Sequence, residues 1–412
     1  MRYFTVLLMA AAGLLAVACD SDSDSNGTTT PPVDTVWTFE QFLAQAETTA
    51  ANDRALLVDS FLTYWSAIAI PPVHVAPDSE FGTAAFVLTS TANSATVAGD
   101  FNGWNPGADP MLRLNGTTLF YVVKRFEKNA RFDYKFVTNG NNWILDPRNP
   151  RIMPGGFGAN SQMWMPAFTP PVEAAADTSI AHGTSQTFSI HSDIMNNTRT
   201  VTVYLPAGYD TTQDYRVLYT HDGPDYRNFL RIHNIADYLI GHNEVAPFIV
   251  ATVPWASPPG REGEYHMNAN FARFFTEELI PYMDSHFATL AAPEGRAIAG
   301  ESSAGLGAVY LAWARHEYFR WAIGQSGYYS WNGDALLDSI SAAPTRDVRF
   351  YLEVGTYETN MGGGVNLVTA QERLAAVLQQ KDYVYESLYF PDGHSWGNWQ
   401  AAMPDAIRWM WQ

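Results

Sequence analysis

Cysteine is almost absent from the chain, because its 412 residues contain only Cys19. A single cysteine excludes an intramolecular disulfide framework and any metal site built from several cysteine ligands. Basic residues are also scarce, with 24 Lys and Arg against 42 Asp and Glu and a formal net charge of −18. This acidity argues against nucleic acid as a partner. The sequence contains no internal repeat and no Walker-type glycine-rich loop, so nothing in it indicates a solenoid or a P-loop nucleotide site.

The first residues resemble an export signal. Residues 1–18 combine one arginine, an apolar stretch and small residues at the end, and the apolar stretch is too short for a membrane-spanning helix. Cys19 directly follows Leu-Ala-Val-Ala, so we expect it to carry a lipid after cleavage and to anchor the protein to a membrane. Residues 19–36 are polar and contain proline, which predicts a flexible tether. The expected location is the cell envelope, facing the periplasm or the cell surface.

The rest of the chain divides into four segments. Residues 37–75 carry apolar side chains at helical spacing, which predicts a short helical segment. Residues 80–166 show short alternating runs broken by Gly, Asn and Pro, typical of a small antiparallel β-sandwich of immunoglobulin-like type. Residues 167–180 are a proline-containing linker. Residues 181–412 alternate strand-length apolar runs with helical patterns, which predicts an α/β fold class with mostly parallel strands.

Two adjacent serines stand in the run IAGESSAGLGA, between a strand-like and a helix-like stretch. The run resembles the nucleophile elbow of α/β hydrolases, in which the residues two before and two after the nucleophile must be small. For Ser302 these neighbours are Gly300 and Ala304, whereas Ser303 would place a glutamate two residues before the nucleophile. Ser302 is therefore the candidate nucleophile, and Ala304 is the one departure from the G-x-S-x-G pattern.

A serine needs a histidine that takes its proton, and that histidine needs an acid that holds its tautomer. Two histidines follow Ser302. His394 lies in a loop directly after a predicted strand and is the candidate base, whereas His316 lies at the end of a predicted helix. Glu358, three residues past the strand-like RFYLEVG, is the candidate acid, since the chain order in these folds is serine, acid, histidine. Glu353 falls within the predicted strand, and Asp382 and Asp392 are the alternative acids.

Two backbone N–H groups are needed to stabilise the negative charge that develops on the substrate. Ser303, directly after the nucleophile, supplies the first. The second is expected in the loop after RVLYTHDG, between Gly223 and Asp225, with Gly223 as the candidate. Candidate substrate-binding aromatics in loops after predicted strands are Trp255, Tyr328 and Trp396. Arg261 is expected either to form an ion pair that orients a loop or to contact an anionic substrate.

The second half of the chain is similar to the esterase family that includes enterochelin (siderophore) esterases and feruloyl and acetyl-xylan esterases. The matching stretches run from about 185 to 410, and the most specific are the Arg-x-x-Glu-Tyr stretch at Arg261 and GHSWGNW around His394. The resemblance implies an α/β-hydrolase fold with Ser302 as nucleophile, His394 as base and Glu358 at the acid position, which is Asp in many members. Such a mechanism requires no metal and no organic cofactor.

The sandwich segment resembles a second family, the carbohydrate-binding modules related to glycogen-binding domains and to the N-terminal domains of isoamylases. The similar stretches are TVAGDFNGWNP, FDYKFVTNGNNWILDPRNP and GGFGANSQMW. By this resemblance Trp104, Lys135 and Trp143, together with Asn160, fall where such domains bind sugar rings. Aromatic faces suit the stacking of pyranose rings. The alternative is a structural appendage without glycan contact.

These observations together predict an exported, lipid-anchored serine carboxylesterase that removes feruloyl or acetyl esters from polysaccharide. The expected partners are an ester-bearing small molecule or polysaccharide and, through Cys19, a membrane. Three alternatives stay open: a siderophore esterase of the enterochelin type, a glycan-binding lipoprotein with an inactive hydrolase domain, and an enzyme that transfers an acyl group to a sugar.

Overall fold

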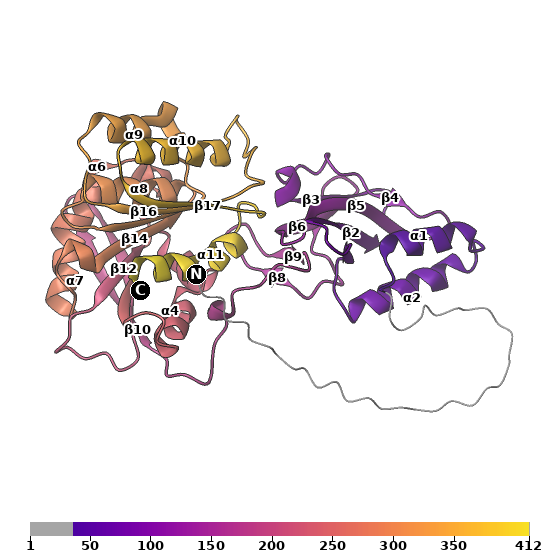
Figure 1. The fold of residues 1–412 in the computed structure, drawn as a ribbon, viewed down its shortest axis with the longest axis horizontal. Helices are drawn as coiled ribbons and strands as arrows, with labels where there is room; N and C mark the ends of the chain where they lie inside the picture. The colour runs from indigo at the N-terminus through magenta and orange to yellow at the C-terminus, as the bar shows by residue number, and fades with distance from the viewer. Residues whose placement is uncertain (1–35, 412) are drawn as a thin grey trace. The chain divides into compact units, whose positions relative to one another are not determined.

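The computed structural model describes residues 36–411 (Figure 1). The predicted signal, Cys19 and almost all of the predicted tether lie outside the described residues. From Thr38 onward the chain forms one compact unit. No helix within residues 36–411 combines the length and the apolar character needed to cross a bilayer.

Two short helices precede the first sheet, α1 (Phe39–Thr48) and α2 (Arg54–Ser66). The Thr38 hydroxyl accepts a hydrogen bond from the Gln41 N–H and starts α1 as half of a capping box. The rings of Phe42 and Phe61 stack at 4.3 Å between the two helices, which buries the apolar faces that the sequence spacing predicts.

The sandwich consists of two antiparallel sheets, as predicted. The first contains β1 (Val73–Val75), β2 (Phe81–Thr89), β5 (Leu119–Glu127) and β4 (Leu112–Arg113), in that spatial order. The second contains β3 (Ala95–Gly99), β6 (Arg131–Thr138), β9 (Asn160–Trp164) and β8 (Ile152–Met153), with β7 (Asn142–Ile144) paired to β6. Alternate residues of β6, Phe132, Tyr134 and Phe136, fill the core between the sheets. The residues between them, Arg131, Asp133 and Lys135, therefore lie on the other face of this sheet.

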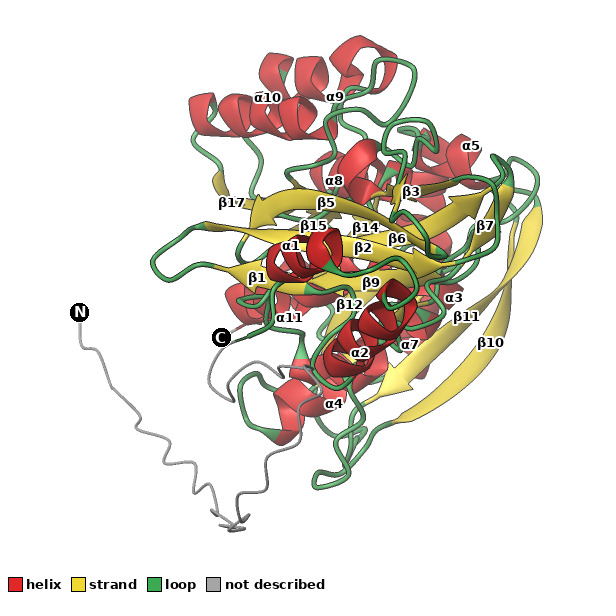
Figure 2. Cartoon of the chain, turned by 90° about the vertical axis from the view of Figure 1, so that its right-hand side faces the viewer, coloured by secondary structure: helices red, strands yellow, loops and turns green. Residues whose placement is uncertain are grey.

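The large sheet follows the linker and contains eight strands. They are β10 (Thr184–Ser192), β11 (Asn197–Leu205), β12 (Arg216–Thr220), β13 (Phe248–Thr252), β14 (Arg296–Glu301), β15 (Trp321–Gln325), β16 (Arg349–Gly355) and β17 (Val384–Phe390). Their spatial order is β10-β11-β13-β12-β14-β15-β16-β17. The β10–β11 hairpin pairs antiparallel at one edge and is the long curved ribbon of Figure 2, whereas β13 through β17 pair in parallel. The predicted α/β class is thereby confirmed.

Helices cover both faces of this sheet (Figure 1). They are α3 (Gly223–Asn228), α4 (Ile232–Gly241), α5 (Arg261–Tyr265), α6 (Ala269–Arg273), α7 (Ile280–His286), α8 (Ser303–Ala314), α9 (Trp331–Ala342), α10 (Leu367–Gln380) and α11 (Trp396–Trp411). A π-helical stretch, Phe274–Leu279, joins α6 to α7. Alternate strand residues feed two cores: Tyr219 and Ile298 pack with α8 and α10, whereas Leu218 and Ala297 pack with α4 and α11.

The sandwich core also receives one side chain from the large α/β region. The ring of Tyr357, in the loop after β16, lies 4.6 Å from the ring of Phe132 in an edge-on contact. The Tyr357 hydroxyl donates a 2.8 Å hydrogen bond to the Glu127 carboxylate. The loop that carries Glu358 is thus packed into the sandwich through its immediate neighbour.

Candidate active site

Ser302 occupies the sharp turn between β14 and α8. Its backbone has φ 56° and ψ −125°, a strained left-handed conformation for a residue other than glycine. Gly300 lies directly against the Ala304 carbonyl, so that any Cβ at position 300 would overlap it. The small residue two positions before Ser302 is therefore a steric requirement of this turn.

Ser302, His394 and Glu358 are joined by hydrogen bonds. The Ser302 Oγ lies 3.1 Å from His394 Nε2, and His394 Nδ1 lies 2.6 Å from Glu358 Oε2. Glu358 is fully buried, and its other carboxylate oxygen accepts hydrogen bonds from the Ser326 hydroxyl at 2.7 Å and the Gly355 N–H at 2.8 Å. The carboxylate is held in one orientation with one oxygen aimed at the histidine.

The three residues come together because each follows the carboxyl end of a parallel strand, β14, β16 and β17 in turn. Adjacent parallel strands end at the same edge of a sheet, which is where open α/β folds place their sites. The Trp399 ring meets the His394 ring edge-on at 5.0 Å and limits its rotation.

Glu353 and the two alternative acids, Asp382 and Asp392, make other contacts. Glu353 is buried within β16, where its carboxyl accepts hydrogen bonds from the side-chain amides of Gln325 and Asn398, both at 3.2 Å. Burial, and then the charge of Glu358, raises the pKa of Glu353 well above its ordinary value. Asp392 bonds to Arg131 instead of the histidine, and Asp382 lies in the turn after α10.

The predicted oxyanion donors have different outcomes. Ser303 begins α8, and N–H groups in the first turn of a helix have no acceptor within the helix. The prediction that Gly223 supplies the second oxyanion donor is corrected by the structure. The Gly223 N–H donates to the Val253 carbonyl at 3.1 Å, so it is not free for a substrate. Pro224 has no N–H, and the Asp225 N–H donates to the Asp222 carbonyl. The Gly223 turn passes so close to the backbone of Thr252 and Val253 that its N–H finds a partner within the fold.

Arg261 forms the ion pair that was one of its two predicted roles. Its Nε donates to Asp222 at 2.8 Å, and its terminal nitrogen donates to the Glu301 carboxylate at 2.8 Å. Burial, and then the negative charge of Asp222, raises the pKa of Glu301 well above its ordinary value, and Arg261 opposes this shift. Two buried carboxyl groups therefore already surround the guanidinium.

The predicted aromatic candidates separate into exposed and buried side chains. Trp255 is 45% exposed and Tyr328 is half-buried, so both are accessible from solvent. Trp396 is only 9% exposed and packs in the core below the sheet, against Tyr226 and Phe229. Trp396 therefore contributes to the core instead of an open pocket.

His266 is a neighbour of the site that sequence reasoning missed. Its Nε2 lies 3.3 Å from the Ser303 hydroxyl and 2.5 Å from the Glu262 carboxylate. Its ring lies 5.0 Å from the ring of Trp331. The one signal in the sequence is its position five residues after Arg261, in the stretch that carries the family resemblance.

The predicted sugar-binding residues lie on the sandwich. The rings of Trp104 and Trp143 lie 6.5 Å apart at 29°, and Trp143 is 42% exposed. Lys135 stands on the outer face of β6 near Gly158, whereas the Asn160 amide donates to Asp133 at 3.1 Å. The proposed glycan contact stays a prediction.

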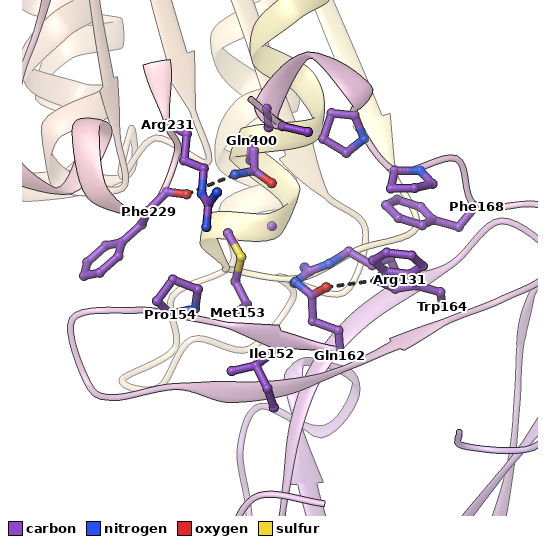
Figure 3. A pocket seen from close by; sticks show the side chains of 15 residues that line it. Arg131, Ile152, Met153, Pro154, Gln162, Trp164, Phe168, Phe229, Arg231 and Gln400 are labelled. Carbon is purple, nitrogen blue, oxygen red and sulfur yellow. Dashed lines mark hydrogen bonds between the residues drawn. The ribbon is translucent and has the colours of Figure 1, made fainter. Parts of the chain in front are cut away.

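A cavity of about 240 Å³ is lined in part by Gly397 and Gln400 of α11, and none of Ser302, His394 and Glu358 is among its lining residues (Figure 3). Side chains from β8, β9, the linker, α11 and the turn between α3 and α4 form its walls, among them Met153, Trp164, Arg231 and Gln400. Arg131 borders it from the sandwich side.

Comparisons with known proteins agree with this geometry. The chain is 26% identical over 236 residues to the uncharacterized protein YjcH of Bacillus subtilis, covering 55% of this chain and 97% of that one. It is 29% identical over 164 residues to endo-1,4-beta-xylanase Y of Acetivibrio thermocellus, covering 36% of this chain and 15% of that enzyme.

Among solved structures, the enterobactin esterase FES of Shigella flexneri superimposes with a TM-score of 0.72 at 21% identity. The match covers 85% of this chain and 98% of that one, which confirms the hydrolase fold. The family model Esterase, described as "Putative esterase", matches residues 192–410, more than half of the chain. The chain therefore belongs to the Esterase family, whose members are carboxylic ester hydrolases.

Proposed function

We propose that the chain is a serine carboxylesterase in which Ser302 is the nucleophile, His394 the general base and Glu358 the residue that orients the histidine. The observation that carries the proposal is the continuous hydrogen-bonded chain from the Ser302 hydroxyl through both imidazole nitrogens to a buried carboxylate. Neither a metal nor an organic cofactor takes part in the proposed steps.

The reaction follows from these contacts. His394 Nε2 removes the hydroxyl proton as the Ser302 oxygen attacks the ester carbonyl, and the Ser303 N–H stabilises the oxyanion. The imidazolium then protonates the departing alcohol, which leaves an acyl group on Ser302. A water molecule, deprotonated by His394, then attacks the acyl carbonyl, and the imidazolium returns its proton to the Ser302 oxygen as the carboxylic acid leaves.

We propose an aromatic or acetyl ester of a neutral carbohydrate as the substrate class. The guanidinium of Arg261 already pairs with Asp222 and contacts Glu301, so it offers little attraction to a polyanion. Trp255 and Tyr328 offer accessible aromatic surface for a phenolic acyl group. The similarity to xylanase Y supports a plant polysaccharide as the carrier.

A siderophore ester is the second candidate. It is favoured by one observation, the structural similarity to an enterobactin esterase over 85% of this chain, which includes the sandwich as well as the large sheet. The pairing of Arg261 with Asp222 and Glu301 argues against a polyanionic siderophore as the substrate.

A panel of three esters separates the candidates. We expect kcat/KM for methyl ferulate to exceed that for a cyclic tricatecholate ester by about 10²-fold or more, since each 1.4 kcal/mol of differential binding is tenfold. p-Nitrophenyl acetate, which demands little of the binding pocket, serves as the control for intact chemistry. A higher value for the tricatecholate would reverse the order of the two candidates.

We also propose that the protein is exported and lipid-anchored at Cys19. The support is the apolar segment that ends directly before the only cysteine of the chain. Metabolic labelling with an alkyne-tagged fatty acid is expected to label the full-length protein in the membrane fraction. The Cys19→Ser variant is the matched control, and equal labelling of both proteins would reject the anchor.

A further inference from the structure

The loop that carries His394 is held by a side chain of the β-sandwich, that of Arg131. Residues 391–395 connect β17 to α11, and Arg131, the first residue of β6 in the sandwich, lies against them. One terminal nitrogen of Arg131 donates to Asp392 Oδ1 at 3.0 Å and to the Ser395 hydroxyl at 2.6 Å. These partners stand two residues before and one residue after His394. The guanidinium of Arg131 thus contacts the loop on both sides of the histidine, and this pair of contacts is the Arg131 grip.

Backbone contacts add to this grip. The Arg131 N–H donates to the Pro391 carbonyl at 3.1 Å. Gly397 lies so close to the guanidinium that a Cβ there would overlap it, and Gly393 is packed equally closely against Asp100. The loop therefore has no room to shift toward the sandwich.

The Arg131 grip is buried, and the positive charge of Arg131 lies among several carboxyl groups. Arg131 is 1% exposed, and its other terminal nitrogen bonds to Asp133, which is 2% exposed. Asp100 accepts the Asp133 N–H at 2.7 Å. Burial raises the pKa of Asp392 to about 7, while Arg131 acts in the opposite direction. Arg131 is the cation among three buried carboxyl groups, so its removal changes the whole cluster.

We infer that Arg131 is a positioning residue for His394, through which the β-sandwich sets the geometry of the catalytic histidine. The inference rests on the proposed function. Glu358 contacts His394 through the imidazole ring, whereas Arg131 holds the loop backbone that carries the ring. A displacement of about 1 Å at a reacting group can cost about 10²-fold in rate, which makes the backbone position decisive.

The first test compares Arg131→Ala with Arg125→Ala in the full chain. Arg125 is an exposed arginine of the same domain whose guanidinium lies over the Phe81 ring, so its replacement removes the same atoms without touching the loop. With p-nitrophenyl acetate we expect kcat of Arg131→Ala to fall about 10²-fold below that of Arg125→Ala, with KM changed less than about threefold. Equal kcat values in the two folded variants would overturn the inference.

Chemical rescue distinguishes positioning from general loss of structure. Arg131 borders the cavity of about 240 Å³, so a free guanidinium ion has a route to the vacated position (Figure 3). Guanidinium, at concentrations far below those that unfold the chain, is expected to raise kcat of Arg131→Ala several-fold, whereas sodium chloride at equal ionic strength is not. No rescue of a folded variant would count against the proposed grip.

Two further variants cover the case in which Arg131→Ala does not fold. Ser395→Ala and Asp392→Asn each remove one partner on the loop and keep the guanidinium. Each is expected to lower kcat about tenfold with KM unchanged, and wild-type kcat in both would overturn the inference. The proposed function fails separately, if the folded wild type and Arg125→Ala hydrolyse none of the three esters of the panel.

Discussion

Replacing Ser302 by alanine is expected to lower kcat for p-nitrophenyl acetate by about 10⁴-fold or more, the usual cost of removing the nucleophile of a triad. The Ser302 hydroxyl is the group that lies 3.1 Å from His394 Nε2. No bulk is added in the strained turn, so the variant is expected to fold, which thermal unfolding checks. Single-turnover kinetics should show no burst of p-nitrophenol, because no acyl-enzyme forms.

Ser303→Ala is the matched control, since it removes the same atom one residue later. Its hydroxyl contacts His266, while its contribution to the oxyanion is a backbone N–H that alanine retains. We expect kcat to stay within about tenfold of the wild type, the scale of a single weak side-chain contact. Loss of activity in Ser303→Ala with retention in Ser302→Ala would show that the steric reading of the turn is wrong.

Replacing Glu358 by glutamine is expected to lower kcat by about 10⁴-fold with little change in KM, because an amide no longer fixes the imidazole tautomer that leaves Nε2 free to accept the serine proton. The change preserves side-chain volume in a fully buried position. Ser326 and Gly355 donate to one oxygen of this carboxylate and hold its orientation, so the glutamine has little freedom to find another arrangement. Steady-state kinetics and thermal unfolding of the same preparation provide the measurement.

Glu353→Gln is the control for this second result. Glu353 is also fully buried, five residues earlier, but its carboxyl bonds to Gln325 and Asn398 and not to the histidine. We expect its kcat to remain within about tenfold of the wild type, even if the melting temperature falls. Equal losses in both variants would mean that activity depends on the buried carboxylates as a group instead of on the orientation of His394.

The sequence predicts the central strands of the large sheet well, because each contains a run of apolar residues. β13 and β14 are buried at every position; β13 is apolar up to its terminal threonine, and in β14 the buried Arg296 and Glu301 flank the run Ala-Ile-Ala-Gly. β10 is different: its first six residues are exposed or half-buried, and it lies at the edge of the sheet. A polar edge strand has no apolar run, so only its pairing with β11 identifies it.

The candidate site divides in the same way. Ser302, Glu358 and His394 are recognisable because local features, a turn and two strand ends, fix their places in the chain. The Gly223 N–H is occupied because the Val253 carbonyl approaches it, and Trp396 is buried because other helices pack against it. Neither contact involves residues that are close to Gly223 or Trp396 in the sequence. The Arg131–Asp392 contact joins residues 261 positions apart, and no local pattern contains it.

The contact of Tyr357 with the sandwich bears on whether the sandwich of this chain could be exchanged for another domain. Its ring is part of the packing around Phe126 and Phe132, while its neighbour Glu358 faces the histidine. The linker at 167–180 is the point at which the sandwich could be exchanged for another domain. Such an exchange would remove Phe126 and Phe132 from the Tyr357 ring, next to Glu358. In this chain the sandwich and the esterase half therefore depend on each other for the packing around Tyr357.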